Sequence, residues 1–162
     1  MPTPDTRAPA MHISRQLADL FSQGGTLGAA QNYDDADYET LYTLGHRLYG
    51  QARYQDAVRV FGFLVLHNHL ENRYTTAYAS SLQMVARYPE AIQYYSMASL
   101  LDINDPLPTF HTAECLLAMG LVAEAKEALG FVLEQSDAPQ YAELKTQAEA
   151  MLALLDQPGA KP

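Results

Sequence analysis

The chain has 162 residues, 48% hydrophobic and 18% charged, which is enough for one folded domain with a sizeable core and too few for two ordinary ones. Its formal net charge of −9 and its lack of a basic stripe argue against a nucleic-acid partner and against adhesion to an anionic membrane. With one cysteine, no signal-peptide core and no apolar run near the roughly 18 residues of a membrane span, we expect a soluble protein of a reducing cytoplasm.

The N-terminal part is expected to carry one short helix. Residues 1–10 are rich in Pro and Thr and are predicted to be disordered, and residues 11–36 to form an amphipathic helix followed by a linker. The apolar face of this helix consists of Ile13, Leu17, Leu20 and Phe21. Because a lone helix of this length is unstable in water, its apolar face must dock, either on its own chain or in a dimer. We favour the dimer.

A recurrence at intervals of 34 residues dominates the rest of the chain. It relates the acidic-Ala pairs 56–57, 90–91 and 124–125, and the small residues Gly45, Ala79 and Ala113. Small residues let two antiparallel helices approach closely, with a bulky residue of one filling the space left by the other. The period is that of the tetratricopeptide repeat (TPR), so residues 37–156 are predicted to form an all-α TPR solenoid.

Three helix-turn-helix repeats are expected at about 38–70, 72–104 and 106–138. Their helices are predicted at 37–51 and 55–67, at 71–85 and 89–101, and at 107–119 and 122–135, with Gly120 ending the fifth. The acids Asp34, Asp35 and Asp37 are expected to cap the first of them. A last helix at 139–155 would cap the open end of the solenoid, before a disordered tail at 157–162.

The first helices of the repeats form the concave wall of such a solenoid, and their exposed stripes predict a peptide-binding groove. Tyrosine offers contact area together with a hydroxyl that can serve a peptide carbonyl. The predicted groove residues are Tyr42, His46, Tyr49 and Tyr54 of the first repeat, Arg73, Thr76, Ser80 and Gln83 of the second, and Phe110 and Glu114 of the third. For Tyr88 and Tyr95 we favour ordinary packing between helices.

Nothing in the sequence indicates catalysis or a cofactor. The chain lacks a Gly-rich phosphate loop, a zinc-protease motif and a nucleophile elbow. His111, Glu114 and Cys115 share a helix face, but three ligands without a fourth are a weak metal signal. Cys115 lies in an apolar run and is expected in the core. We therefore expect no enzyme activity, no metal site and no cofactor.

Several stretches are more specific than the general repeat pattern. They are LYTLGHRLYGQARYQDAVRVF (Leu41–Phe61), ASLLDINDP (Ala98–Pro106), FHTAECLLAMG (Phe110–Gly120) and FSQGGTL (Phe21–Leu27). Together they resemble the class II, SycD/LcrH-type translocator chaperones of bacterial type III secretion. The resemblance implies a chaperone of the bacterial cytoplasm that binds hydrophobic translocator proteins before export. It also implies a P-x-L-x-x-P-like guest segment in the groove and a homodimer formed through the N-terminal region.

The resemblance has departures, and other functions stay open. His46 stands where the family has an aromatic residue and His67 where it has an aliphatic one, so we expect a more polar groove. A generic TPR adaptor that clamps a terminal carboxylate is the first alternative, although only Arg73, with Arg47 nearby, could act as the clamp. A regulator that sequesters a transcription factor is the second.

Overall fold

The computed structural model describes Thr26 and residues 34–157. The predicted N-terminal helix, with its dimerisation residues Ile13, Leu17, Leu20 and Phe21, lies outside these residues. So do the predicted disordered start at 1–10 and the last five residues of the tail.

The described residues form an all-α fold, as predicted, with seven α-helices. The helices are α3 (Asp35–Gly50), α4 (Tyr54–His67), α5 (Asn72–Met84), α6 (Tyr88–Leu101), α7 (Leu107–Ala118), α8 (Val122–Gln135) and α9 (Ala142–Leu155). The first six begin and end within about two residues of their predicted positions. The last differs at its start, because a 3-10 turn, η1 (Pro139–Tyr141), precedes α9. None of the helices in this part of the chain has the length and hydropathy of a membrane span.

The start of α3 is fixed by the predicted acids. The Asp34 carboxylate accepts a hydrogen bond from the Asp37 backbone N–H at 2.8 Å, and the Asp37 side chain accepts in return from the Asp34 N–H. This capping box satisfies two backbone donors that an uncapped helix would leave unpaired. The cap sets the point at which the repeat array begins.

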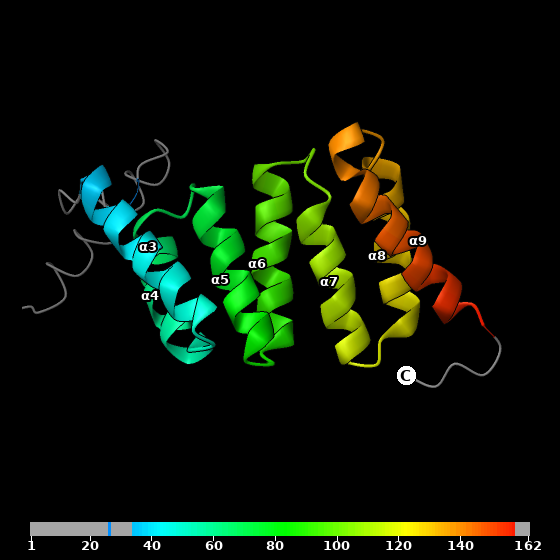
Figure 1. Ribbon diagram of the computed structural model, residues 1–162, viewed down its shortest axis with the longest axis horizontal. Coiled ribbons are helices and arrows are strands. Elements are labelled where there is room, and N and C mark those ends of the chain that lie inside the picture. Colours follow the sequence, from blue (N-terminus) through cyan, green and yellow to red (C-terminus); the bar gives the residue numbers. More distant parts are fainter. Residues whose placement is uncertain (1–25, 27–33, 158–162) are drawn as a thin grey trace, which may run out of the picture.

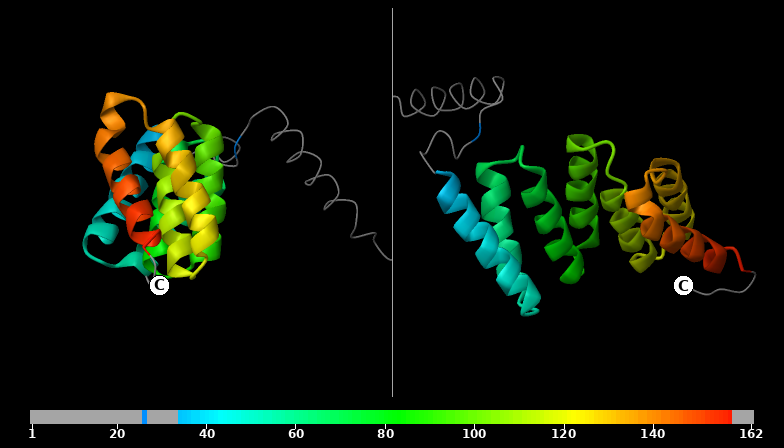
Figure 2. Two further views of the ribbon diagram at one scale, coloured as in Figure 1. Left: turned by 90° about the vertical axis from the view of Figure 1, so that its right-hand side faces the viewer. Right: turned by 45° about the horizontal axis from the view of Figure 1, so that its top comes forward.

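The helices stand side by side in chain order, with α3 at one end and α9 at the other (Figure 1). Each packs mainly on its neighbours in sequence, as expected of a solenoid, and the right-hand view of Figure 2 shows the same succession from α3 to α9. The first helices of successive repeats also touch directly, α3 against α5 and α5 against α7. These three helices therefore form one continuous wall.

The small residues of the 34-residue recurrence lie where the helices cross. Gly45 is buried and Ala79 and Ala113 are fully buried, as are the bulky residues Tyr95 and Leu129 that recur on the second helices. A Cβ atom on Gly45 would lie 2.5 Å from Cε1 of Phe61, so any other residue there would force the Phe61 ring to shift. At the open end, Ala148 of α9 is fully buried in the cluster of the third repeat. Close packing thus follows the predicted pattern.

Each helix pair is joined by the same turn, which requires a left-handed residue. That residue is Ala52 (φ 57°), Ala86 (φ 60°) or Gly120 (φ 77°), one repeat apart in each case. In the first turn, Arg53 N–H donates to the Leu48 carbonyl at 2.9 Å, and Ala52 N–H donates to the Tyr49 carbonyl at 3.0 Å. The other two turns repeat these bonds. All three are Schellman motifs, for which glycine is the favoured residue.

We expect Ala52→Gly and Ala86→Gly each to stabilise the protein by roughly 0.5–1 kcal/mol, because alanine pays a steric cost in the left-handed region that glycine does not. Gly120→Ala should destabilise it by a similar amount. Urea unfolding of the three single variants, followed by circular dichroism, measures these differences. A neutral Gly120→Ala together with a destabilising Ala52→Gly would show that turn strain does not control the stability of these repeats.

Candidate peptide-binding groove

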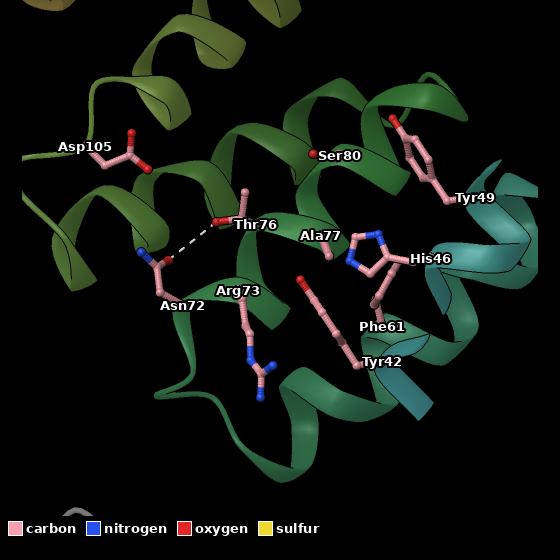
Figure 3. A pocket seen from close by; sticks show the side chains of 10 residues that line it. All are labelled: Tyr42, His46, Tyr49, Phe61, Asn72, Arg73, Thr76, Ala77, Ser80 and Asp105. Atoms are coloured by element: carbon pink, nitrogen blue, oxygen red, sulfur yellow. Dashed lines mark hydrogen bonds between the residues drawn. The ribbon is translucent and has the colours of Figure 1, made fainter. Parts of the chain in front are cut away.

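A hollow of about 420 Å³ opens in the wall between α3 and α5 (Figure 3). Phe61 of α4 and Ala77 of α5 contribute apolar surface to it, and Asp105 reaches it from the loop between α6 and α7. The lining residues are Tyr42, His46, Tyr49, Phe61, Asn72, Arg73, Thr76, Ala77, Ser80 and Asp105. Ligand sites in proteins commonly have volumes of this order, so the hollow can accept side chains of a partner.

Aromatic rings make one side of the hollow. Tyr42 lies edge-on to His46, with ring centroids 4.4 Å apart, and both rings also meet Phe61 edge-on, at 5.9 and 5.2 Å. Edge-to-face pairs of this kind stabilise one another by roughly 0.5–1.5 kcal/mol beyond the area they bury. The rings are therefore held in place before any guest arrives.

Two tyrosine hydroxyls in this wall are available as hydrogen-bond donors. Burial raises the pKa of both Tyr42 and Tyr49; the positive charge of Arg73 opposes part of the effect at Tyr42, whereas Tyr54 and Glu114 add to it at Tyr49. Both phenols therefore stay protonated at neutral pH. A neutral phenol can donate to a peptide carbonyl, which is the role that the sequence predicted for this stripe.

Arg73 is the only lysine or arginine among the described residues that line the hollow, and it is already engaged. Its guanidinium forms an ion pair with Glu39 and lies over the Tyr42 ring, 4.9 Å from the centroid. Nε is 3.6 Å from a carboxylate oxygen of Glu71. The hydrogen bond to Glu39 raises the pKa of Arg73 above its ordinary value, so the side chain stays charged. A single paired cation does not make the cluster of free cations that a terminal carboxylate would need.

A polar network continues the groove from α5 to α7. The Tyr95 hydroxyl lies 2.7 Å from Oε1 of Gln83 and 3.1 Å from Oγ of Ser80. Gln83 Nε2 donates to Oε2 of Glu114 at 3.1 Å, and His111 Nδ1 lies 2.8 Å from the same oxygen. Because Ser80 also lines the hollow, the network and the hollow are parts of one groove.

The structure brings six of the ten predicted groove residues together around the hollow: Tyr42, His46, Tyr49, Arg73, Thr76 and Ser80. Gln83 and Glu114 lie beyond it, in the polar network. Tyr54 does not line the hollow and instead packs edge-on against Tyr49, with ring centroids 5.1 Å apart.

Phe110 does not lie in the groove, contrary to the prediction from the sequence. Its side chain is only 5% exposed and packs with Ala113 and Leu129 in the core of the third repeat. An apolar ring at the start of α7 gains more from burial between helices than from exposure on the wall. The third repeat therefore contributes polar rather than aromatic surface.

Sequence reasoning missed two features of the site. Asp105 comes from a loop, where helical spacing carries no information. The sequence favours a packing role for Tyr95, and its ring is indeed fully buried, but its hydroxyl reaches the polar network.

Among the described residues, no group of His, Cys, Asp and Glu side chains could hold a metal ion. Cys115, adjacent to Glu114, is fully buried, and burial raises the pKa of its thiol to about 12.

No protein-family model matches the chain. It is 35% identical over 137 residues to low calcium response locus protein H of Yersinia pseudotuberculosis, a match that covers 84% of this chain and 82% of the relative.

Solved structures of type III secretion chaperones are similar to this one, among them the following two. SycD of Yersinia enterocolitica, a type III secretion chaperone in complex with a peptide of the translocator YopD, has a TM-score of 0.71 and 33% identity, over 75% of this chain and 94% of SycD. PcrH of Pseudomonas aeruginosa, in complex with the chaperone binding region of PopD, has a TM-score of 0.73 and 30% identity, over 76% of this chain and 94% of PcrH.

Proposed function

Because the chain belongs to the family of type III secretion translocator chaperones that includes SycD and low calcium response locus protein H, we propose that its groove holds a segment of a translocator. The segment would be extended and of the P-x-L-x-x-P type. The hollow between α3 and α5 carries this proposal, because it joins an apolar floor to a wall of fixed aromatic rings. The relatives are chaperones, and this chain likewise acts by binding rather than by catalysis.

The groove offers an extended guest two kinds of contact. An apolar guest side chain can enter the hollow against Phe61 and Ala77, where it leaves water. The hydroxyls of Tyr42 and Tyr49 can donate to carbonyls of the guest backbone, which has no secondary structure of its own to satisfy them. Affinity would come from a few buried anchors rather than from the whole contact area.

Binding of this kind protects the guest by mass action. A translocator carries apolar segments that aggregate or insert into a membrane when they are free in the cytoplasm. A chaperone that binds only the unfolded form lowers the concentration of free apolar segments and so slows aggregation. We place the protein in the bacterial cytoplasm for this reason.

SycD has been solved as a dimer, and we propose that this protein is a homodimer too. Its contacts would be the apolar residues Ile13, Leu17, Leu20 and Phe21. The carboxylate-clamp adaptor is disfavoured, since Arg73 is paired with Glu39. Sequestration of a transcription factor is compatible with the same groove.

Filling the groove tests the proposal. We expect co-expression with a hydrophobic translocator to keep that protein in the soluble fraction, and Thr76→Trp to abolish the effect by occupying the hollow. Thr146→Trp on the exposed face of α9 is the matched control and should protect as well as the wild type. Soluble translocator is measured by sedimentation and blotting. Equal protection by both variants would place the binding site elsewhere.

A further inference from the structure

The polar network has a direction, which follows from its donors and acceptors. The Tyr95 hydroxyl has one proton, and the shorter contact, 2.7 Å to Oε1 of Gln83, takes it. Ser80 must then donate its own proton to the Tyr95 oxygen, 3.1 Å away. With its oxygen turned to Tyr95, Gln83 presents its NH₂ group to Glu114. The chain of hydrogen bonds therefore ends on the Glu114 carboxylate.

Glu114 keeps one oxygen for a guest. Gln83 Nε2 and His111 Nδ1 both bond to its Oε2, and no hydrogen bond or ion pair among the described residues uses its Oε1. The side chain is 37% exposed. The hydrogen bond from His111 holds the pKa of this carboxyl below its ordinary value, so it is an anion at neutral pH.

Glu114 also lies in line with the apolar hollow. His46, Ser80 and Glu114 occupy the same repeat position on α3, α5 and α7, and the first two line the hollow. Packed helices lie roughly 8–10 Å apart, and an extended peptide advances roughly 3.3 Å per residue. One step along the wall, from α5 to α7, thus corresponds to about three residues of an extended guest.

We propose that Glu114, held by Gln83 and His111, is an acidic subsite that takes a lysine or arginine side chain of the guest segment. The inference rests on the proposed function and adds a chemical requirement to it. The basic residue would stand about three to five residues from the apolar anchor that fills the hollow. Glu114 selects for it because no lysine or arginine of the described chain pairs with this carboxylate.

A purely structural role for the network makes a different prediction. If the bonds among Gln83, His111 and Glu114 only hold α5 against α7, Glu114→Gln would weaken every guest to the same extent through a loosened wall. If the Glu114 carboxylate instead binds a basic side chain of the guest, Glu114→Gln would lower the affinity only for guests that carry such a side chain. The ratio of two affinities therefore separates the two roles.

The experiment uses pairs of short synthetic peptides of the P-x-L-x-x-P type. Each pair carries either lysine or norleucine at one position, three to five residues to either side of the leucine. Calorimetric titration of the full chain should show one position at which lysine binds about tenfold more tightly, as expected for a charge-assisted hydrogen bond. The preference should shrink in high salt. In Glu114→Gln it should disappear, while the norleucine peptide keeps its affinity.

Glu127→Gln is the matched control, since it removes the same charge from an exposed position on α8. It should keep the lysine preference. A lysine-to-norleucine ratio that is the same in wild type and Glu114→Gln overturns the acidic subsite and leaves the proposed function standing. If lysine is not preferred over norleucine at any position, the acidic subsite is likewise overturned and the proposed function stands. Failure of all peptides to bind overturns the proposed function, and the subsite with it.

Discussion

Gly45→Ala is expected to destabilise the protein by about 2 kcal/mol, although alanine is the better helix former. The added Cβ would lie 2.5 Å and 2.7 Å from Cε1 and Cζ of Phe61, a ring that is only 1% exposed and cannot move without disturbing the core that it forms with Leu64 and Tyr74. Overpacking of this kind costs roughly 1–3 kcal/mol. Urea unfolding monitored by circular dichroism gives the difference.

Two further variants separate the clash from the glycine itself. Gly130→Ala lies in the interior of α8 with nothing within 4 Å of the new Cβ, so it should stabilise the protein by about 1 kcal/mol. Combined with Phe61→Leu, Gly45→Ala gives the first repeat the same residues, alanine and leucine, that stand at Ala113 and Leu129 in the third. In the Phe61→Leu background, Gly45→Ala should therefore stabilise rather than destabilise the protein. A loss of stability in both backgrounds would mean that Phe61 is not the cause.

The helices could be predicted because one packing rule repeats three times. Gly45, Ala79 and Ala113 mark the same crossing point, so their spacing fixes the helix register. The left-handed residue could be predicted from residue type in only one of the three turns. Gly120 is the residue type expected there, whereas Ala52 and Ala86 adopt the same conformation although alanine does not favour it. Their repeat position, not their chemistry, carries that information.

The groove was predictable only where helical spacing decides which face a side chain takes. Tyr42, His46 and Tyr49 are spaced by four and three, and the structure places all three around the hollow. Phe110 shows the limit, because the stripe of a short helix at its first turn does not distinguish the wall from the core. Asp105 belongs to a loop, and no periodicity points to it.

The replacement Tyr42→Ala with Tyr49→Ala should weaken guest binding by about 100-fold. Each truncated anchor costs on the order of 1–2 kcal/mol, and about 1.4 kcal/mol corresponds to a tenfold change in Kd. Calorimetric titration with a P-x-L-x-x-P peptide measures the loss. Tyr88→Ala with Tyr141→Ala removes two half-buried tyrosines outside the hollow and serves as the matched control. Wild-type affinity in the Tyr42 and Tyr49 variant would contradict the groove assignment.

The phenylalanine variants then divide that loss between ring and hydroxyl. Tyr42→Phe and Tyr49→Phe keep the rings that meet Phe61 and Tyr54 and remove only the donors. A hydrogen bond to a guest carbonyl is worth roughly 0.5–1.5 kcal/mol, so each variant should lose about fivefold in affinity. Because burial raises both phenol pKa values, this contribution should persist through neutral pH and disappear only in strong alkali. Unchanged affinity in both would mean that the aromatic wall binds its guest by contact area alone.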